Sequence, residues 1–361
     1  MSSQAHAPTI GTRRRRQRPA SELVVNSVGL AIVAFIVLWL GVNLVKDWST
    51  FLQLTFSGLT RGSIYALVAL GYTLVYGILE LINFAHGDVF MIGGMVTATI
   101  VIQGFGLDSN PPLGTLVPAI LISIAAAMVV CALLNASIER VAYKPLRSAP
   151  RLVPLITAIG VSFIIENFAF VWKGPRPVEL PPQTLPHDAI FTLGTCPKCA
   201  TLRWDQMFVF LVTIPVLLGL VWLVRYTKQG KAMRATAQDK DAAGMMGIDV
   251  NRTISFTFLV AGALAGAAGV IFTLYGTTIQ WNTGFTLGLI AFTAAVLGGI
   301  GNLTGAVVGA LLIGLIQAFN EGLSWLAPGS DWTRSLVFAI LIAILVFRPE
   351  GLLGERTPEG A

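Results

Sequence analysis

Long apolar segments separated by short polar ones form the dominant pattern along this chain. A helix needs about 20 mostly apolar residues to cross about 30 Å of hydrocarbon, and it keeps its backbone hydrogen bonds within itself. About ten segments approach that length. They lie near 23–45, 55–79, 89–106, 116–138, 153–172, 207–225, 254–275, 285–301, 303–323 and 334–347. The pattern predicts an all-α polytopic membrane helix bundle with about ten transmembrane helices.

The composition supports a membrane protein. Of the 361 residues, 55% are hydrophobic and 12% are charged, whereas a soluble domain carries about 25% charged residues. Too little polar material remains to cover a water-soluble surface. The glycines of 298–301 interrupt the last third of the chain, where we expect a break in a span or a re-entrant turn.

Basic residues gather in three clusters that set the orientation. Ten spans place all three on one face, which the positive-inside rule makes cytoplasmic, together with both termini. Removing a single earlier span would put one of the clusters outside, so the charges favour an even number of crossings. The Arg-rich N-terminus abuts a spanning segment and lacks interleaved aromatics, which argues against nucleic-acid binding. The clusters are Arg13, Arg14, Arg15, Arg16 and Arg18; Arg140, Lys144, Arg147 and Arg151; and Arg225, Lys228, Lys231, Arg234, Lys240 and Arg252.

The spans divide the chain into a transmembrane domain and two tails. We expect a disordered basic cytoplasmic tail over 1–22, a transmembrane domain over 23–347 and a cytoplasmic tail over 348–361. The first apolar segment is too long for a signal peptide, so it is expected to remain as a helix. The external loop, 173–206, is rich in proline and predicts extended chain. The cytoplasmic loop, 226–253, is rich in alanine and charge and predicts short helices.

The external loop also contains Cys196 and Cys199, spaced as C-x-x-C. Such a pair forms a disulfide in an oxidising compartment or supplies half of a zinc site, and it can equally have no special role. Neither a second pair nor histidines at metal-ligand spacing accompany it, so no metal centre is predicted. Cys131 lies within a span and is expected to pack there.

Four polar residues stand out because they lie in or beside apolar spans. Asn83, His86 and Asp88 separate the second span from the third, and Glu166 lies within the fifth. Ionisable residues at membrane depth are costly and mark pathways or gates. The alternatives are a solvated structural turn near the cytoplasmic interface for 83–88, and an outer-interface position for Glu166.

The sequence lacks the signatures of soluble enzymes, including a Walker A loop, G-x-S-x-G, H-E-x-x-H and a dinucleotide fingerprint. We therefore predict neither a catalytic site nor a bound cofactor. In the cytoplasmic loop, Asp241-Ala-Ala-Gly-Met-Met-Gly247 has the pattern of a short helix with a sharp end. Small residues and one charge suit a docking surface. Glycine pairs at small-x-x-x-small spacing indicate close helix packing; they are Gly58 with Gly62, Gly262 with Gly266 and Gly305 with Gly309.

Several of these stretches resemble one transporter family. Residues 58–79 (GLTRGSIYALVALGYTLVYGIL) and 82–88 (INFAHGD) resemble the LivH-type permease subunit of branched-chain amino-acid ABC transporters. Residues 295–309 and 347–353 are similar to the C-terminal half of that family. The segment beginning at Asp241 resembles the coupling motif of ABC permeases, with Asp in place of the usual Glu.

The resemblance implies a multi-pass permease of the bacterial plasma (inner) membrane that carries branched-chain (aliphatic) amino acids and is not itself an enzyme. It implies a LivM-like second permease, two cytoplasmic ABC ATPase subunits and an extracytoplasmic substrate-binding protein as partners. Asp241, Ala242, Ala243 and Gly247 would form the ATPase-coupling loop. The alternatives are a urea or short-amide permease of the same family, and an ion-coupled secondary transporter, although the latter usually needs several intramembrane carboxylates.

Overall fold

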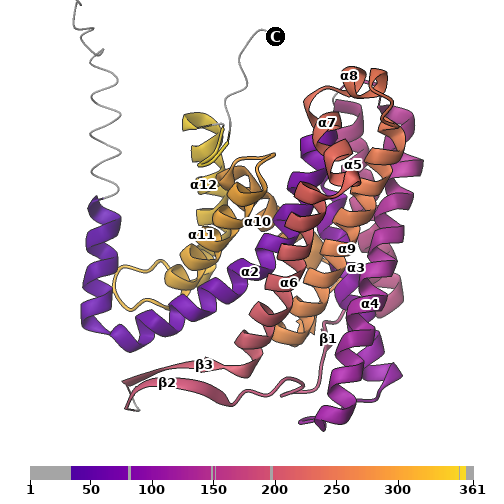
Figure 1. The fold of residues 1–361 in the computed structure, drawn as a ribbon. Coiled ribbons are helices and arrows are strands. Elements are labelled where there is room, and N and C mark those ends of the chain that lie inside the picture. The colour runs from indigo at the N-terminus through magenta and orange to yellow at the C-terminus, as the bar shows by residue number, and fades with distance from the viewer. Residues whose placement is uncertain are drawn as a thin grey trace, which may run out of the picture. The chain divides into compact units, whose positions relative to one another are not determined.

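The computed structural model describes residues 34–79, 83–147, 149–150, 152–195, 198–348 and 350–354 (Figure 1). The predicted tail 1–22 lies outside these residues, as do residues 349 and 355–361 of the predicted tail 348–361. The chain forms two units, Met1–Trp48 and Ser49–Ala361. The described part of the first unit is the helix Ala34–Lys46, which is followed by a hydrogen bond from the Asp47 N–H to the Asn43 carbonyl (3.0 Å).

Eight helices among the described residues are long and apolar enough to cross a membrane. Three of these spans include a short π or 3-10 helix. Helix α3 continues into the π helix η1, α4 continues into the π helix η2 and the 3-10 helix η3, and the 3-10 helix η4 precedes α12. They are α2 (Trp48–Leu79), α3 with η1 (Ala85–Thr99, Ile100–Gly104), α4 with η2 and η3 (Leu113–Ile138, Glu139–Tyr143, Lys144–Leu146), α5 (Leu152–Lys173), α6 (Trp204–Tyr226), α9 (Val250–Gly276), α11 (Leu303–Gly322) and η4 with α12 (Ser330–Trp332, Thr333–Phe347).

The predicted all-α membrane bundle is confirmed, but the count of about ten spans is too high for the described residues. Helix α10 (Thr283–Gly298) has 16 residues, which rise only about 24 Å. The glycines that follow it end the helix, because Gly299 has φ +107° and Gly301 has φ +96°. The break predicted there is therefore present, and it leaves α10 short of a full span.

The loop 173–206 contains strands that the sequence pattern did not predict. Strands β2 (Ala189–Thr195) and β3 (Lys198–Arg203) pair antiparallel as a hairpin. The short β1 (Val178–Glu179) pairs with β4 (Thr278–Ile279), which lies between α9 and α10. The chain is extended in these strands, as expected. Strand pairing satisfies its backbone N–H and C=O groups, which each need a hydrogen-bonding partner.

Helices α3 and α9 occupy the centre of the second unit. Helix α3 contacts α4, α5, α9 and α10, while α9 contacts α4, α6 and α7. The glycine pairs permit close approach: a Cβ on Gly62 would lie 2.8 Å from the Cα of Leu311, and one on Gly266 would lie 2.9 Å from the Cα of Met128. These distances confirm the predicted packing role of the small residues.

The outer helices expose large apolar side chains. On α6, Leu211, Leu218 and Trp222 are exposed, and α4 and α12 show the same pattern. A water-facing surface of this kind would aggregate, whereas lipid tails solvate it. The bundle is therefore built to be surrounded by membrane lipid.

Candidate functional site

One end of the second unit carries two short helices, α7 (Lys228–Gln238) and α8 (Lys240–Met245) (Figure 1). They match the short helices predicted for the loop 226–253. Helix α7 begins at Thr227, whose hydroxyl accepts a hydrogen bond from the Gly230 N–H (3.0 Å). Arg234 donates to the carbonyl of Val224 at the end of α6. These contacts hold the pair of helices on the bundle.

Both ends of α8 are capped. The Asp239 carboxylate accepts from the N–H groups of Asp241 (2.8 Å) and Ala242 (2.9 Å). At the other end the Gly247 N–H donates to Gly244 (3.0 Å) and the Ile248 N–H donates to Ala243 (3.1 Å). This pair of bonds is a Schellman motif, in which the glycine is left-handed. Gly247 has φ +84°, as the sequence pattern predicts.

The exposed side chains of α8 agree only in part with the expected docking residues. Ala243 is only 4% exposed and packs within its own chain, whereas Asp241 is exposed. Met245 and Met246 are 83% and 84% exposed. Two neighbouring flexible thioether side chains form an adaptable apolar surface. Sequence reasoning missed them, although two methionines between two glycines in a charged loop were visible.

A polar network lies beside α8 and joins η2 to the start of α9. Arg147 pairs with the buried carboxylate of Glu139. Arg147 also donates to the side-chain oxygen of Asn251 (2.5 Å). Ser255 donates to the second oxygen of Glu139 (2.7 Å).

The network continues to Asn83. Tyr143, in η2, donates a hydrogen bond to the Asn83 side-chain oxygen (2.8 Å). Asn83 precedes α3, whose first turn contains His86 and Asp88. The structure therefore connects the α8 end of the bundle with the predicted gate residues.

His86 and Asp88 are fully buried, so the alternative of a solvated turn at the membrane surface is wrong for them. Glycines bring the neighbouring helices against this turn: a Cβ on Gly87 would lie 2.7 Å from the Cα of Gly288, in α10. The His86 ring meets the Tyr72 ring edge-on, with 4.9 Å between centroids.

Asp88 and Glu166, far apart in sequence, lie in the same region of the bundle. Ser162 on α5 donates to one carboxylate oxygen of Asp88, and Glu166, one turn further along α5, is within electrostatic reach of Asp88. The other Asp88 oxygen has no hydrogen-bond partner among the described residues. It faces the first turn of α10, where a Cβ on Gly284 would lie 2.7 Å from the Asp88 Cα.

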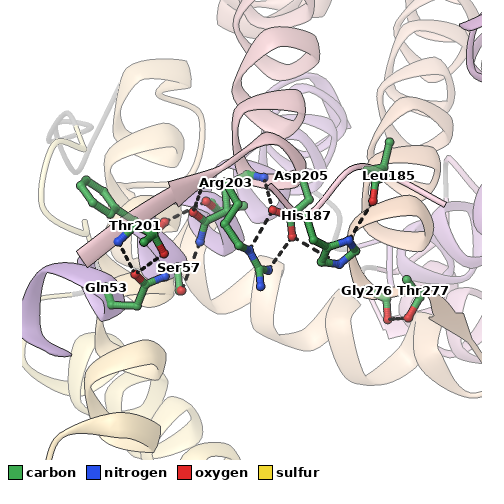
Figure 2. Close-up of polar contacts among 12 residues, drawn as sticks. Gln53, Ser57, Leu185, His187, Thr201, Arg203, Asp205, Gly276 and Thr277 are labelled. Carbon is green, nitrogen blue, oxygen red and sulfur yellow. Dashed lines mark hydrogen bonds and ion pairs between the residues drawn. The ribbon is translucent and has the colours of Figure 1, made fainter. Parts of the chain in front are cut away.

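A second polar network fastens the β-hairpin to the opposite end of the bundle (Figure 2). Arg203 donates to both oxygens of Asp205 (3.1 and 2.5 Å). The Thr201 N–H donates to the side-chain oxygen of Gln53, on α2 (2.8 Å). His187 lies 3.9 Å from Asp205. The hairpin is thus bound to α2 and α6 by side chains and is held as a defined surface.

Of the predicted cysteine pair, the structure places Cys199 in this hairpin. Cys199 lies in β3 opposite Gly194, but Cys196 is outside the described residues, so a disulfide stays a prediction. No group of three or more metal-ligating side chains occurs in the part of the chain that the structure describes.

Sequence reasoning missed one further site. Arg61, on α2, pairs with Glu321, on α11, and both line a cavity of about 400 Å³. The two residues lie 260 positions apart, so no local motif marks their contact.

Comparison with known proteins decides the family. The family described as the branched-chain amino acid transport system / permease component matches residues 54–345. The chain belongs to that family. The match covers every helix from α2 to α12, except the ends of those two, and includes the segment that contains α7 and α8.

Individual relatives point to the same family. The chain is 39% identical to the high-affinity branched-chain amino acid transport system permease protein BraD of Pseudomonas aeruginosa, over 86% of this chain and 97% of BraD. It is 39% identical to LivH of Escherichia coli K12, with the same coverage. The ribose import permease protein RbsC of the same bacterium is 25% identical, over 81% of this chain and 84% of RbsC.

Proposed function

We propose that this chain is a membrane-spanning permease subunit of an ATP-driven importer of branched-chain amino acids in the bacterial plasma membrane. One observation carries the proposal: the 39% identity to BraD and LivH extends over nearly their whole length. The lower identity to RbsC, which is named for ribose, indicates that the fold alone does not select the substrate.

The proposal assigns nucleotide hydrolysis to partner subunits. Of the two ABC ATPases, one would dock on α8 of this chain, with the exposed Met245 and Met246 as the apolar contact and Asp241 beside them. A LivM-like second permease would complete the membrane assembly, and an extracytoplasmic binding protein would deliver the substrate to the end that carries the β-hairpin.

The proposed coupling route follows the hydrogen bonds from α8 to the buried polar residues. ATP binding would shift α8 and α9, and the bonds of Arg147 and Glu139 would transmit the shift to η2. Tyr143 would then move Asn83 and the first turn of α3. Asp88 and Glu166 are the proposed gate, since ionisable groups inside a bundle mark pathways. Alternating access would require the helix interface at these residues to adopt two different packings.

The test is leucine uptake by proteoliposomes that contain the full complex and the binding protein. We expect uptake that requires ATP, with isoleucine and valine as competitors. Urea or short amides that outcompete leucine would support the urea-type alternative. Uptake driven by a proton or sodium gradient without ATP would contradict the ABC assignment and favour the ion-coupled alternative, in which Asp88 and Glu166 would bind the ion.

A further inference from the structure

The cavity of about 400 Å³ near the hairpin end of the second unit lies between α2, α9, α10, α11 and the η4–α12 segment. Its volume lies within the range of about 300–1,000 Å³ that small-molecule sites occupy. None of the residues predicted as a gate lines it. Its lining combines opposite charges with an apolar wall, which a simple packing defect would not need.

The charged part of the lining contains an ion pair. The Arg61 guanidinium, on α2, pairs with the Glu321 carboxylate, on α11. Thr333, on α12, donates to the other Glu321 oxygen (3.3 Å) and fixes the direction of the carboxylate. Arg334, in the first turn of α12, adds a second guanidinium. The pair is only partly buried, with 38% of the Arg61 side chain and 28% of the Glu321 side chain exposed, so a ligand can reach both groups.

An acceptor without a partner lies beside the ion pair. Gln317 precedes Glu321 by one helical turn, so both side chains lie on the same face of α11. Gln317 is only 4% exposed, and its side-chain oxygen has no hydrogen-bond partner among the described residues. A buried acceptor of this kind costs free energy until a donor reaches it. An ammonium group brings three donors, which Gln317 and Glu321 together can accept.

The remaining lining is mixed. Its apolar part consists of Ile64, Phe272, Leu287 and Ile290, while Tyr65, Tyr275, Thr286 and Ser330 bring hydroxyl-bearing side chains. An aliphatic side chain of a few carbons would exclude water from this apolar wall, and each buried CH₂ favours binding.

We infer that this cavity binds the translocated amino acid as a zwitterion, an inference that rests on the proposed function. The ligand's carboxylate takes the fork of Arg61, which matches a carboxylate in bidentate geometry. Its ammonium group takes Glu321 and Gln317, and its aliphatic side chain lies on the apolar wall. On binding, the Arg61–Glu321 ion pair is exchanged for two ion pairs to the ligand.

The variants Glu321→Gln and Arg61→Gln test the site in the full complex in proteoliposomes. Each is expected to keep the complex assembled and to lower leucine uptake by about tenfold or more. The matched controls are Asp331→Asn and Arg176→Gln, exposed residues of the same charges that do not line the cavity. Both should transport as the wild type does.

A combined charge reversal, Arg61→Glu with Glu321→Arg, separates ligand binding from a structural ion pair. The reversal restores the attraction between α2 and α11. It also moves the carboxylate that would accept from the ligand's ammonium group from α11 to α2, away from Gln317. Uptake should stay low. Recovery of uptake would show that the pair is structural and would overturn the inference, as would normal uptake in both single variants.

A measurement on the unmodified complex keeps the inference testable if the variants fail to fold. A photoreactive diazirine analogue of leucine, activated during ATP turnover, should label peptides of α2, α10 or α11 that line the cavity, and excess leucine should prevent this. Absence of such labelled peptides overturns the inference. If the wild-type complex takes up no leucine with ATP, the proposed function fails first. If it does and only the cavity tests fail, the proposed function stands.

Discussion

The phenolic oxygen of Tyr143 lies 2.8 Å from the side-chain oxygen of Asn83, to which it donates a hydrogen bond. Both side chains are buried. The bond joins η2, which shares a polar network with the start of α9, to the residue that precedes α3. It links the end that carries α8 with the turn that contains His86 and Asp88.

We predict that Tyr143→Phe weakens this link. The Asn83 oxygen would stay buried without its donor, at a cost of about 1–3 kcal/mol, and the position of α3 would no longer follow η2. Thermal unfolding of the purified complex should occur at a lower temperature, and uptake should fall. Tyr226→Phe is the control, because Tyr226 is 71% exposed. Equal unfolding temperatures for both variants would show that the bond contributes nothing.

The second prediction concerns the left-handed end of α8. Gly247→Val places a β-branched residue at φ +84° and strains the backbone by about 1–2 kcal/mol. Membrane insertion should be unaffected, while co-purification of the ATPases and transport should be lost. Gly244→Ala is the matched control, since Gly244 is helical and nothing lies within 4 Å of an added Cβ. If Gly247→Val retains full co-purification and uptake, α8 is not the docking helix.

A third prediction separates the surface of α8 from its interior. The double variant Met245→Ser with Met246→Ser removes the exposed apolar pair and leaves the caps of α8 in place. The ATPases should bind at least about tenfold more weakly, because desolvated apolar anchors carry most of such interfaces. Lys240→Ser, an exposed change on the same helix, should have little effect. Pull-down of purified ATPase at several concentrations measures both, and unchanged binding by the double variant contradicts the assignment.

The fourth prediction concerns orientation. Single cysteines at Ala189 and Ala237, both exposed, are introduced with Cys131, Cys196 and Cys199 changed to Ala. An impermeant thiol reagent added to intact cells should label position 189 and leave 237 unlabelled until the cells are opened. The reverse pattern would invert the topology that the basic clusters predict.

The fifth prediction tests the close contact beside Asp88. Gly87→Ala places a Cβ 2.7 Å from the Cα of Gly288, so α3 and α10 must separate. Overpacking of this kind costs about 1–3 kcal/mol, and the purified complex should unfold at a lower temperature and transport less. Gly160→Ala is the control, because an added Cβ there meets open space. A wild-type unfolding temperature for Gly87→Ala would mean that the two helices have room to move apart.

The membrane spans and the end of α8 could be predicted from the sequence because the forces that determine them are local. Some 20 consecutive apolar residues prefer lipid whatever their neighbours are. A glycine after a short helical segment adopts φ > 0 because its own steric freedom allows it. The glycine spacing likewise indicated close packing, although it did not say which helix each glycine meets.

Only the tertiary structure decided which side chains share a site. Helices in this bundle are apolar on all sides, so the sequence does not distinguish a face toward lipid from a face toward protein. Ser162 therefore could not be assigned to Asp88, 74 positions away, nor Glu321 to Arg61. Ala243 appeared suited to face a partner, yet it packs within its own chain. Hydropathy determines that each helix lies in lipid. Close contacts between particular glycines and the neighbouring helices determine which helices pack together, and the candidate sites depend on that packing.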